Sequence, residues 1–314
     1  MSNSAIAASG LRKAFGDKTV LDGIDLDVRA GTVFSLLGPN GAGKTTTVNV
    51  LTTLWKADAG TVRVAGHDVA TETKAVRAAI GVTGQFAAVD ELLTGQENLQ
   101  LMADLKHLGS AGAGRLVTDL LERFDLQESA HKLAATYSGG MRRKLDLAMT
   151  LVGSPQIIFL DEPTTGLDPR SRRTMRGIIR ELVADGVTVF LTTQYLEEAD
   201  QLSDRIAVLD QGHLVAQGTP AELKRLIPGS HVQLRFTDVA ELDDAARVLS
   251  SSTRGDEDLT LRVPTDGRAK SLRALLASLD DQSIEVEEFS VHTPDLDDVF
   301  LALTGRTSTE ENAR

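Results

Sequence analysis

Short apolar runs alternate with helical patterns through the first two thirds of the chain. Three runs are compact enough for buried strands: Thr32–Leu37, Gln156–Leu160 and Val187–Thr193. Three further segments carry apolar residues at helical spacing: Lys44–Leu54, Arg170–Ala184 and Leu196–Leu202. Strands and helices that alternate in this way predict an α/β fold, in which helices cover the faces of a mainly parallel sheet.

The N-terminal segments Ala5–Leu11 and Val20–Val28 are short and alternate between apolar and polar residues. This pattern is typical of half-buried strands, so we expect an antiparallel edge there.

The C-terminal part of the chain is also expected to fold, as a small α/β domain. Thr293-Pro294 predicts the start of a last helix, with Pro at the first helical position and aspartates near the positive end of its dipole. Only the residues from Thr304 onward are expected to be a loose end. The pattern predicts strands at Val232–Phe236, Leu259–Val263 and Ile284–Val291, and helices at Ala240–Leu249 and Lys270–Leu279.

Composition and charge change at a turn-rich tetrapeptide, Ile227-Pro228-Gly229-Ser230. The segment His231–Arg314 holds 18 acidic and 9 basic residues, so it carries −9 of the net charge of −12. We therefore place a domain boundary between residues 1–228 and residues 229–314. The alternative is that this tetrapeptide is only a surface loop.

Composition excludes several classes of function. The 314 residues include 45 acidic and 33 basic ones, which makes the chain a poor non-specific binder of nucleic acid. The chain has no cysteine, so it is no disulfide scaffold, thiol enzyme or cysteine-ligated zinc protein. No apolar run approaches the ~20 residues of a membrane-spanning helix, and residues 1–10 lack the pattern of a secretory signal. We expect an intracellular protein that can be held at a membrane by a partner.

A glycine-rich loop follows the first buried strand. Residues 38–45 match the pattern G-x-x-x-x-G-K-[ST], in which backbone N–H groups and a helix N-terminus face a phosphate chain. Lys44 is expected to contact the β- and γ-phosphates, and the Thr45 hydroxyl to ligate Mg²⁺. A glycine-rich turn without a ligand is the alternative. The expected ATP contacts of this loop are Gly38, Pro39, Asn40, Gly41, Ala42, Gly43, Lys44, Thr45 and Thr46.

Two acidic residues follow the second buried strand. Ligands of an open α/β sheet bind beyond the carboxyl ends of its strands. Asp161 is therefore suited to hold Mg²⁺, and Glu162 to polarise an attacking water. Since many strands end in acids, this prediction depends on the glycine-rich loop.

A second expected anion site precedes the helix Arg142–Leu151. Ser138 is suited to cap this helix, and Gly139 and Gly140 leave the N–H groups at its start accessible to an anion. An ordinary helix cap is the alternative.

These motifs, in this order, resemble the nucleotide-binding subunit of ABC transporters over residues 5 to about 225. The family's Leu-Ser-Gly-Gly-Gln signature is present as Tyr-Ser-Gly-Gly-Met at residues 137–141. The resemblance implies a P-loop NTPase fold with a helical subdomain at about residues 86–152. It also implies a head-to-tail pair of copies that bind ATP and Mg²⁺, in which the signature of one copy caps the ATP of the other.

The resemblance implies roles for four more residues. Phe15 lies where the family has an aromatic ring that stacks on adenine, although Phe15 could also be a core residue. Gln85 lies where a Gln contacts Mg²⁺, water and the transmembrane partner, and Asp168 where an Asp communicates across the dimer. Gln194 replaces a His that usually contacts the γ-phosphate; an amide can donate one hydrogen bond there but carries no charge. We therefore expect slow but real ATP hydrolysis.

Three longer runs, at residues 137–146, 192–201 and 297–305, are similar to the ATPase subunit of daunorubicin/doxorubicin-resistance type exporters. In such systems a separate integral membrane permease forms the pore. The similarity implies a second copy of the chain and the permease as partners, a place at the cytoplasmic face of the membrane, and a hydrophobic drug or lipid-like metabolite as cargo. The C-terminal domain would stabilise or regulate the dimer, or be a passive cap.

Two other functions compete with this interpretation. A non-transport switch on ribosomes or DNA usually has a second ATPase cassette or a basic arm, and this sequence shows neither. A phosphoryl-transferring kinase could share the glycine-rich loop, but the signature helix and Glu162 argue against it.

Overall fold

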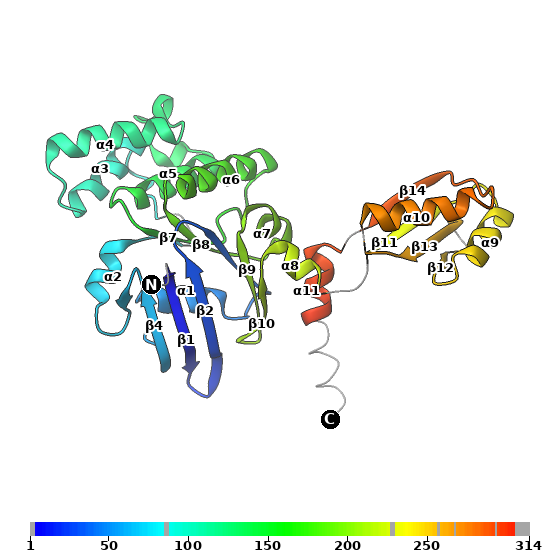
Figure 1. The fold of residues 1–314 in the computed structure, drawn as a ribbon. Helices are drawn as coiled ribbons and strands as arrows, with labels where there is room; N and C mark the ends of the chain where they lie inside the picture. The colour runs from blue at the N-terminus through cyan, green and yellow to red at the C-terminus, as the bar shows by residue number, and fades with distance from the viewer. Residues whose placement is uncertain are drawn as a thin grey trace. The chain divides into compact units, whose positions relative to one another are not determined.

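The computed structural model describes residues 4–84, 88–226, 230–255, 258–266, 268–292 and 294–304. The chain divides into two compact units, Met1–Pro220 and Ala221–Arg314 (Figure 1). The predicted boundary between residues 228 and 229 falls on residues outside the described ranges and stays a prediction. Within those ranges, no helix combines the length and the apolar character that crossing a membrane requires.

The first unit contains two sheets. A six-stranded sheet has the order β10-β9-β3-β8-β7-β6, and all its pairs are parallel except β10 with β9. A four-stranded antiparallel sheet has the order β2-β1-β4-β5. The predicted α/β class with a mainly parallel sheet is confirmed. The N-terminal segments pair in antiparallel fashion as predicted, but they belong to this separate sheet and are not an edge of the parallel one. The strands are β1 (Ser4–Phe15), β2 (Lys18–Arg29), β3 (Val33–Leu37), β4 (Ala59–Val64), β5 (His67–Asp68), β6 (Ile80–Thr83), β7 (Ile157–Asp161), β8 (Thr188–Thr193), β9 (Arg205–Asp210) and β10 (His213–Gly218).

The helices of this unit differ from the predicted ones at a few points. Helix α1 ends three residues before the predicted end, because Thr53 adopts a left-handed conformation with φ of 64°. Helices α2, α3 and α4 were not predicted individually, and the small-residue stretch at residues 109–114 forms the start of α4. The helices are α1 (Lys44–Leu51), α2 (Thr73–Ala79), α3 (Gly95–Leu105), α4 (Ser110–Arg123), α5 (Gly139–Leu151), α6 (Pro169–Ala184) and α7 (Leu196–Leu202), with 3₁₀ turns at Gln127–Ser129 and Ala134–Thr136; α8 (Pro220–Lys224) spans the division between the units.

Alternate residues of the central strands face two different cores. On β7, Ile158 and Leu160 pack into a core with helices α3 to α6, whereas Ile157 and Phe159 pack into a core with α1 and the antiparallel sheet. Figure 1 shows the same layers, with α3 to α6 on one side of β7 and β8 and the strands β1, β2 and β4 on the other. Burial on both faces explains why these strands are continuous apolar runs in the sequence.

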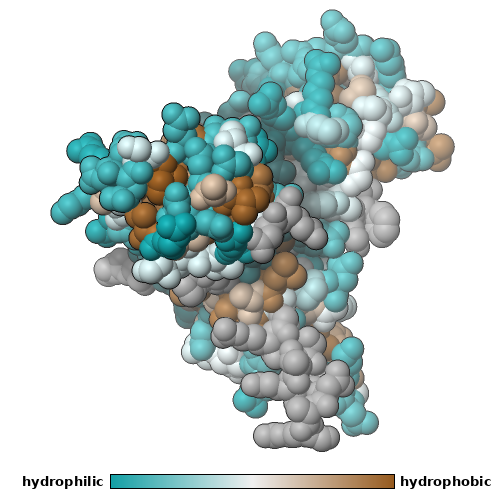
Figure 2. Space-filling model, turned by 90° about the vertical axis from the view of Figure 1, so that its right-hand side faces the viewer, coloured by the Kyte–Doolittle hydropathy of each residue, from teal (hydrophilic) through white to brown (hydrophobic). Residues whose placement is uncertain are grey.

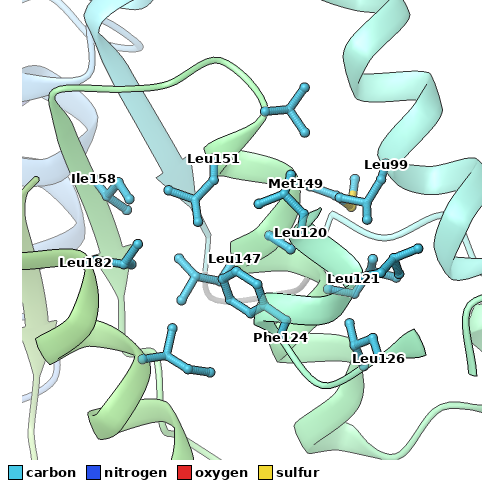
Figure 3. Packing of buried hydrophobic residues seen from close by; sticks show 14 of the residues in the cluster. Leu99, Leu120, Leu121, Phe124, Leu126, Leu147, Met149, Leu151, Ile158 and Leu182 are labelled. Atoms are coloured by element: carbon cyan, nitrogen blue, oxygen red, sulfur yellow. The ribbon is translucent and has the colours of Figure 1, made fainter. Parts of the chain in front are cut away.

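Helix α5 lies at the centre of the first core (Figure 3). Its apolar side chains lie between those of the helical subdomain and those of β7 and α6. The helix is therefore packed on two sides, which fixes the positions of the polar residues that it carries. The labelled residues are Leu147, Met149 and Leu151 of α5, Leu99, Leu120, Leu121, Phe124 and Leu126 on one side, and Ile158 and Leu182 on the other.

The second unit is an antiparallel sheet of the order β12-β13-β11-β14 with its own apolar core. Strand β14 forms one edge, and its side chains are exposed, including Phe289; Figure 2 shows exposed apolar side chains among the hydrophilic ones on one face of the molecule. The elements are β11 (His231–Arg235), α9 (Val239–Val248), β12 (Thr253–Gly255), β13 (Thr260–Pro264), α10 (Ala269–Asp280), β14 (Glu288–His292) and α11 (Leu296–Thr304).

Two predicted elements of this unit are partly wrong. The strand predicted from Ile284 begins only at Glu288, because Ile284 is buried in the core and its N–H donates to the carbonyl of Leu279 at the end of α10. The last helix begins at Leu296 and not at Pro294. The Asp295 side chain accepts a hydrogen bond from the N–H of Asp298 at 2.9 Å, so an aspartate caps this helix.

Candidate functional site

The glycine-rich loop connects β3 to α1, and two of its glycines are required by close packing. A Cβ atom on Gly38 would lie 2.3 Å from the carbonyl oxygen of Leu209. Gly43 begins α1 with φ of +111°, and a Cβ there would lie 2.7 Å from Leu21 Cδ2 and 3.0 Å from the Val20 carbonyl oxygen. A side chain at either position would displace neighbouring backbone, so the sequence motif reflects a real steric need.

A cavity of about 280 Å³ opens at this loop. Among the expected ATP contacts of the loop itself, Gly38, Pro39 and Ala42 do not line it. Lys18 and Val20 of β2 do line it, and the sequence carries no local signal for them because they reach the loop only through the fold. The lining residues are Lys18, Val20, Asn40, Gly41, Gly43, Lys44, Thr45, Thr46 and Glu162.

Lys44 places a buried ammonium group in this cavity. Its Nζ donates to the carbonyl oxygens of Gly38 at 2.7 Å and Pro39 at 3.1 Å, and lies 3.8 Å from Glu162 Oε1. Burial lowers the pKa of Lys44, while the carboxylates of Glu162 and Asp161 act in the opposite direction. A cation between the loop and these two acids is suited to a phosphate chain.

Two of the three expected Mg²⁺ ligands, Thr45 and Asp161, are in direct contact. Thr45 Oγ1 donates to Asp161 Oδ2 at 3.1 Å, and Thr192 Oγ1 donates to the other carboxylate oxygen of Asp161. No group of three or more His, Cys, Asp or Glu side chains that could hold a metal occurs in the described ranges. One hydroxyl and one carboxylate fit Mg²⁺, which commonly takes few protein ligands and completes its shell with phosphate oxygens and water.

Glu162 lies directly after β7 in a left-handed conformation with φ of 49°. This conformation costs a non-glycine residue about 1–3 kcal/mol and persists only where the surroundings impose it. The N–H of Glu162 donates to both the carbonyl oxygen and Oγ1 of Thr192, each at 3.1 Å. Thr165 Oγ1 donates to Glu162 Oε2 at 3.2 Å, so the carboxylate that lines the cavity is also held in place.

The Ser138 motif lies at another helix start. Ser138 caps α5, and its Oγ accepts a hydrogen bond from the N–H of Met141 at 3.3 Å. Nothing lies within 4 Å of a Cβ built on Gly139, whereas a Cβ on Gly140 would lie 2.6 Å from Ser171 Oγ. None of the three motif residues lines the cavity at Lys44.

Asp168 caps helix α6 next to this motif. Its carboxylate accepts hydrogen bonds from the N–H groups of Arg170 and Ser171, each at 3.0 Å, and from Ser171 Oγ at 2.5 Å. The hydrogen bonds from Ser171 are the main reason that the pKa of Asp168 is lowered. Asp168 is therefore an ionised helix cap within its own chain.

The remaining predicted site residues are less closely connected to the cavity. Phe15 ends β1, is 44% exposed, and makes an edge contact with Trp55 at 4.9 Å between ring centroids; it does not line the cavity. Gln194 directly follows β8 and is partly buried. Gln85 lies outside the described residues.

A glycine-rich loop between a parallel strand and a helix has a buried lysine and Glu162 at one cavity, and Asp161 is hydrogen-bonded to Thr45 of the same loop. This arrangement defines a P-loop nucleoside triphosphatase. Comparison with known proteins narrows the class. The ABC transporter family model matches residues 21–165, and the model of the C-terminal domain of DrrA1-3-like ATP-binding proteins matches residues 218–304.

Relatives match along nearly the whole chain. The chain is 46% identical to the daunorubicin resistance ATP-binding protein DrrA2 of Streptomyces coeruleorubidus, with 100% of this chain and 99% of that protein covered. It is 48% identical to the daunorubicin/doxorubicin resistance ATP-binding protein DrrA of Streptomyces peucetius, with 98% and 96% covered. A solved dimer of the ATP-binding cassette MJ0796, bound to ADP and Pi, is 25% identical with a TM-score of 0.62, and the match covers 68% of this chain and 98% of that one.

The chain therefore belongs to the ATP-binding subunits of ABC transporters, in the group that includes the daunorubicin/doxorubicin-resistance proteins. It binds ATP and hydrolyses it, and this hydrolysis is coupled to transport. Subunits of this family generally form dimers and pair with a membrane permease. The resemblance found in the sequence is confirmed.

Proposed function

We propose that two copies of this chain bind two ATP molecules between them and drive a separate permease that exports a hydrophobic drug or lipid-like metabolite. The observation that carries this proposal is the separation of the two anion-binding helix starts. The cavity at Lys44 is lined without any residue of the Ser138 motif, while Gly139 faces open space. The motif is then available to a nucleotide held by another copy.

Within one site, each residue has a distinct role. Lys44 neutralises phosphate charge, and Phe15 stacks on the adenine ring. Thr45 and Asp161, with Gln85, hold Mg²⁺, which when bound neutralises charge on the phosphate oxygens. Glu162 accepts a hydrogen bond from the attacking water and orients it toward the γ-phosphate. Gln194 donates its amide N–H to that phosphate, and Asp168 acts across the dimer.

The names of the relatives support the export function. Several are daunorubicin or doxorubicin resistance ATP-binding proteins, and others, 38% identical, are Nod factor export ATP-binding proteins. We infer that the chain lies at the cytoplasmic face of the membrane, bound to its permease. Membrane vesicles that contain both proteins should accumulate doxorubicin with ATP and should not do so with Glu162→Gln.

Dimerisation is tested with the same variant. Glu162→Gln should bind MgATP, hydrolyse it negligibly and elute as a dimer in size-exclusion chromatography with light scattering. Adding Ser138→Arg to this variant should return the protein to a monomer while ATP still binds, because the Lys44 cavity is intact. A Glu162→Gln protein that stays monomeric at saturating MgATP would refute the proposed dimer.

A further inference from the structure

A buried arginine connects helix α5 to the strand end that carries Glu162. The Nε of Arg143 donates to the carbonyl oxygen of Pro163 at 3.1 Å, and its Nη2 donates to the carbonyl oxygen of Asp161 at 3.1 Å. These are the residues directly before and after Glu162. One guanidinium therefore binds the backbone on both sides of the residue proposed to orient the attacking water.

The same guanidinium has two further partners. Its Nη1 donates to the carbonyl oxygen of Gly84 at 2.8 Å and to Asp146 Oδ2 at 3.3 Å. Asp146 also accepts a hydrogen bond from the N–H of Ala88 at 3.0 Å. Since Arg143 and Asp146 are both buried, each charge is compensated by the other and by backbone dipoles. One guanidinium group binds three carbonyl oxygens here. Only arginine has a planar group with enough N–H donors for this arrangement.

The backbone at Glu162 needs this kind of support. The peptide group between Asp161 and Glu162 is held at both ends, since its C=O accepts from Arg143 and its N–H donates to Thr192. On the other side, the carbonyl oxygen of Glu162 itself accepts from the N–H of Thr165 at 3.3 Å, and the carbonyl of Pro163, one residue further along, is held by Arg143. Fixing the peptide groups on both sides imposes the left-handed φ of 49° at Glu162, which an isolated chain would rarely adopt.

We propose that Arg143 is a positioning residue for hydrolysis, which holds Glu162 in the conformation that places its carboxylate in the cavity. Arg143 itself does not line the cavity, so it acts through the backbone and not on the nucleotide. Its own position is fixed because α5 is packed between two layers of the core (Figure 3). The inference rests on the proposed role of Glu162.

The test replaces both charges of the buried pair, Arg143→Met with Asp146→Asn, so that no uncompensated charge remains and the asparagine oxygen can still accept from Ala88. The expected result is a kcat lowered by about 100-fold, the size of effect that a misplaced reacting group produces. The dissociation constant for ATP should change by less than about 3-fold, because the cavity lining is unchanged. The single variant Arg143→Lys, with Asp146 unchanged, should have a kcat between those of the parent and the double variant. The reason is that a lysine ammonium can bind one or two of the three carbonyl oxygens.

Lys144→Met is the matched control. It removes one positive charge from the next residue of the same helix, and Lys144 Nζ lies 3.4 Å from Asp125 Oδ2. This variant should keep the parent kcat. If the double variant does not fold, the kcat of Arg143→Lys is the test of the proposal. A kcat equal to that of the parent overturns the proposal.

Two other results would also overturn it. One is a folded double variant with the parent kcat; the other is a loss of ATP affinity and thermal stability in proportion to the loss of kcat, which indicates a structural role alone. Glu162→Gln separates this inference from the proposed function. Turnover that survives Glu162→Gln refutes the role of Glu162 itself, whereas turnover lost there but kept in the double variant refutes only the role of Arg143.

Discussion

The two glycines of the Ser138 motif have different surroundings, which predicts different responses to alanine. A Cβ on Gly140 would lie 2.6 Å from Ser171 Oγ and 3.1 Å from Ser171 Cβ, whereas nothing lies within 4 Å of a Cβ on Gly139. Ser171 cannot turn away freely, because its Oγ donates to Asp168 Oδ2 at 2.5 Å. Gly140→Ala should therefore disturb the contact between the first turns of α5 and α6.

The size of this effect follows from two contributions. Overpacking costs about 1–3 kcal/mol. Alanine gains about 1 kcal/mol over glycine within a helix. We expect Gly140→Ala to lower the free energy of unfolding by about 0–2 kcal/mol.

Removing the side chain of Ser171 should remove the destabilisation caused by Gly140→Ala. In a Ser171→Gly background, Gly140→Ala should be neutral or stabilising by up to about 1 kcal/mol, so the coupling energy between the two sites is about 2 kcal/mol. Urea unfolding of the parent, both single variants and the double variant measures this coupling directly. Equal costs of Gly140→Ala in the two backgrounds would show that the contact with Ser171 does not exist.

ATPase activity then separates the roles of the two glycines. The activity lost in Gly140→Ala should return in Gly140→Ala/Ser171→Gly, because that glycine is needed for helix contact within one chain. Gly139→Ala should keep the parent stability and still lose ATP-dependent dimerisation, since its methyl group occupies the space proposed for the other copy's nucleotide. A Gly139→Ala protein that dimerises as the parent does would contradict the proposed place of that nucleotide.

Two further predictions concern single residues. Gln194→His should change kcat and add a pH dependence near the pKa of histidine that the parent lacks, and a large loss of turnover in steady-state assays would show that the glutamine is tuned for this site. Glu198 is buried, and burial raises its pKa above 4.5 even though the hydroxyl groups of Thr193 and Thr164 and, more weakly, the charges of Arg176 and Arg172 act in the opposite direction. The folded protein therefore binds this proton more tightly than the unfolded one, so the parent should lose stability as pH rises from about 4.5 through the folded pKa, by about 1.4 kcal/mol per unit of pKa difference. Urea unfolding across this range should show a flatter profile for Glu198→Gln, and identical profiles would contradict the assignment.

The parts of the site that could be predicted from the sequence are those whose geometry is local. The loop that ends in Lys44 and Thr45 and the acids after β7 are contiguous segments, so a strand, a turn and a helix start place them with little help from the rest of the fold. Lys18 and Arg143 could not be found in this way. Each reaches the site through contacts between elements that are distant in the chain, and such contacts leave no periodic signal.

Element boundaries failed where tertiary contacts competed with a local pattern. Ile284 has the apolar character expected of the predicted strand. Its side chain is instead buried in the core of the second unit, and the strand begins only at Glu288. At the last helix, Asp295 caps the helix and does not lie within its first turn as predicted, because its carboxylate accepts a hydrogen bond from the N–H of Asp298. In both cases a specific hydrogen bond or buried contact determines at which of several neighbouring residues the strand or helix begins.

The position of Arg143 on α5 has a consequence for the proposed dimer. Ser138 and Arg143 are five residues apart, or about 7.5 Å along a helix, so they move together when α5 moves. If Ser138 caps the nucleotide of the other copy, binding of that nucleotide exerts a force on α5. The same helix carries Arg143, which binds the carbonyl oxygens of Asp161 and Pro163. The backbone around Glu162 in one site is then linked to occupancy of the other site by packed, hydrogen-bonded contacts within a single chain. This linkage gives a physical reason for hydrolysis to wait until both nucleotides are enclosed, without any change in the residues that touch the phosphates.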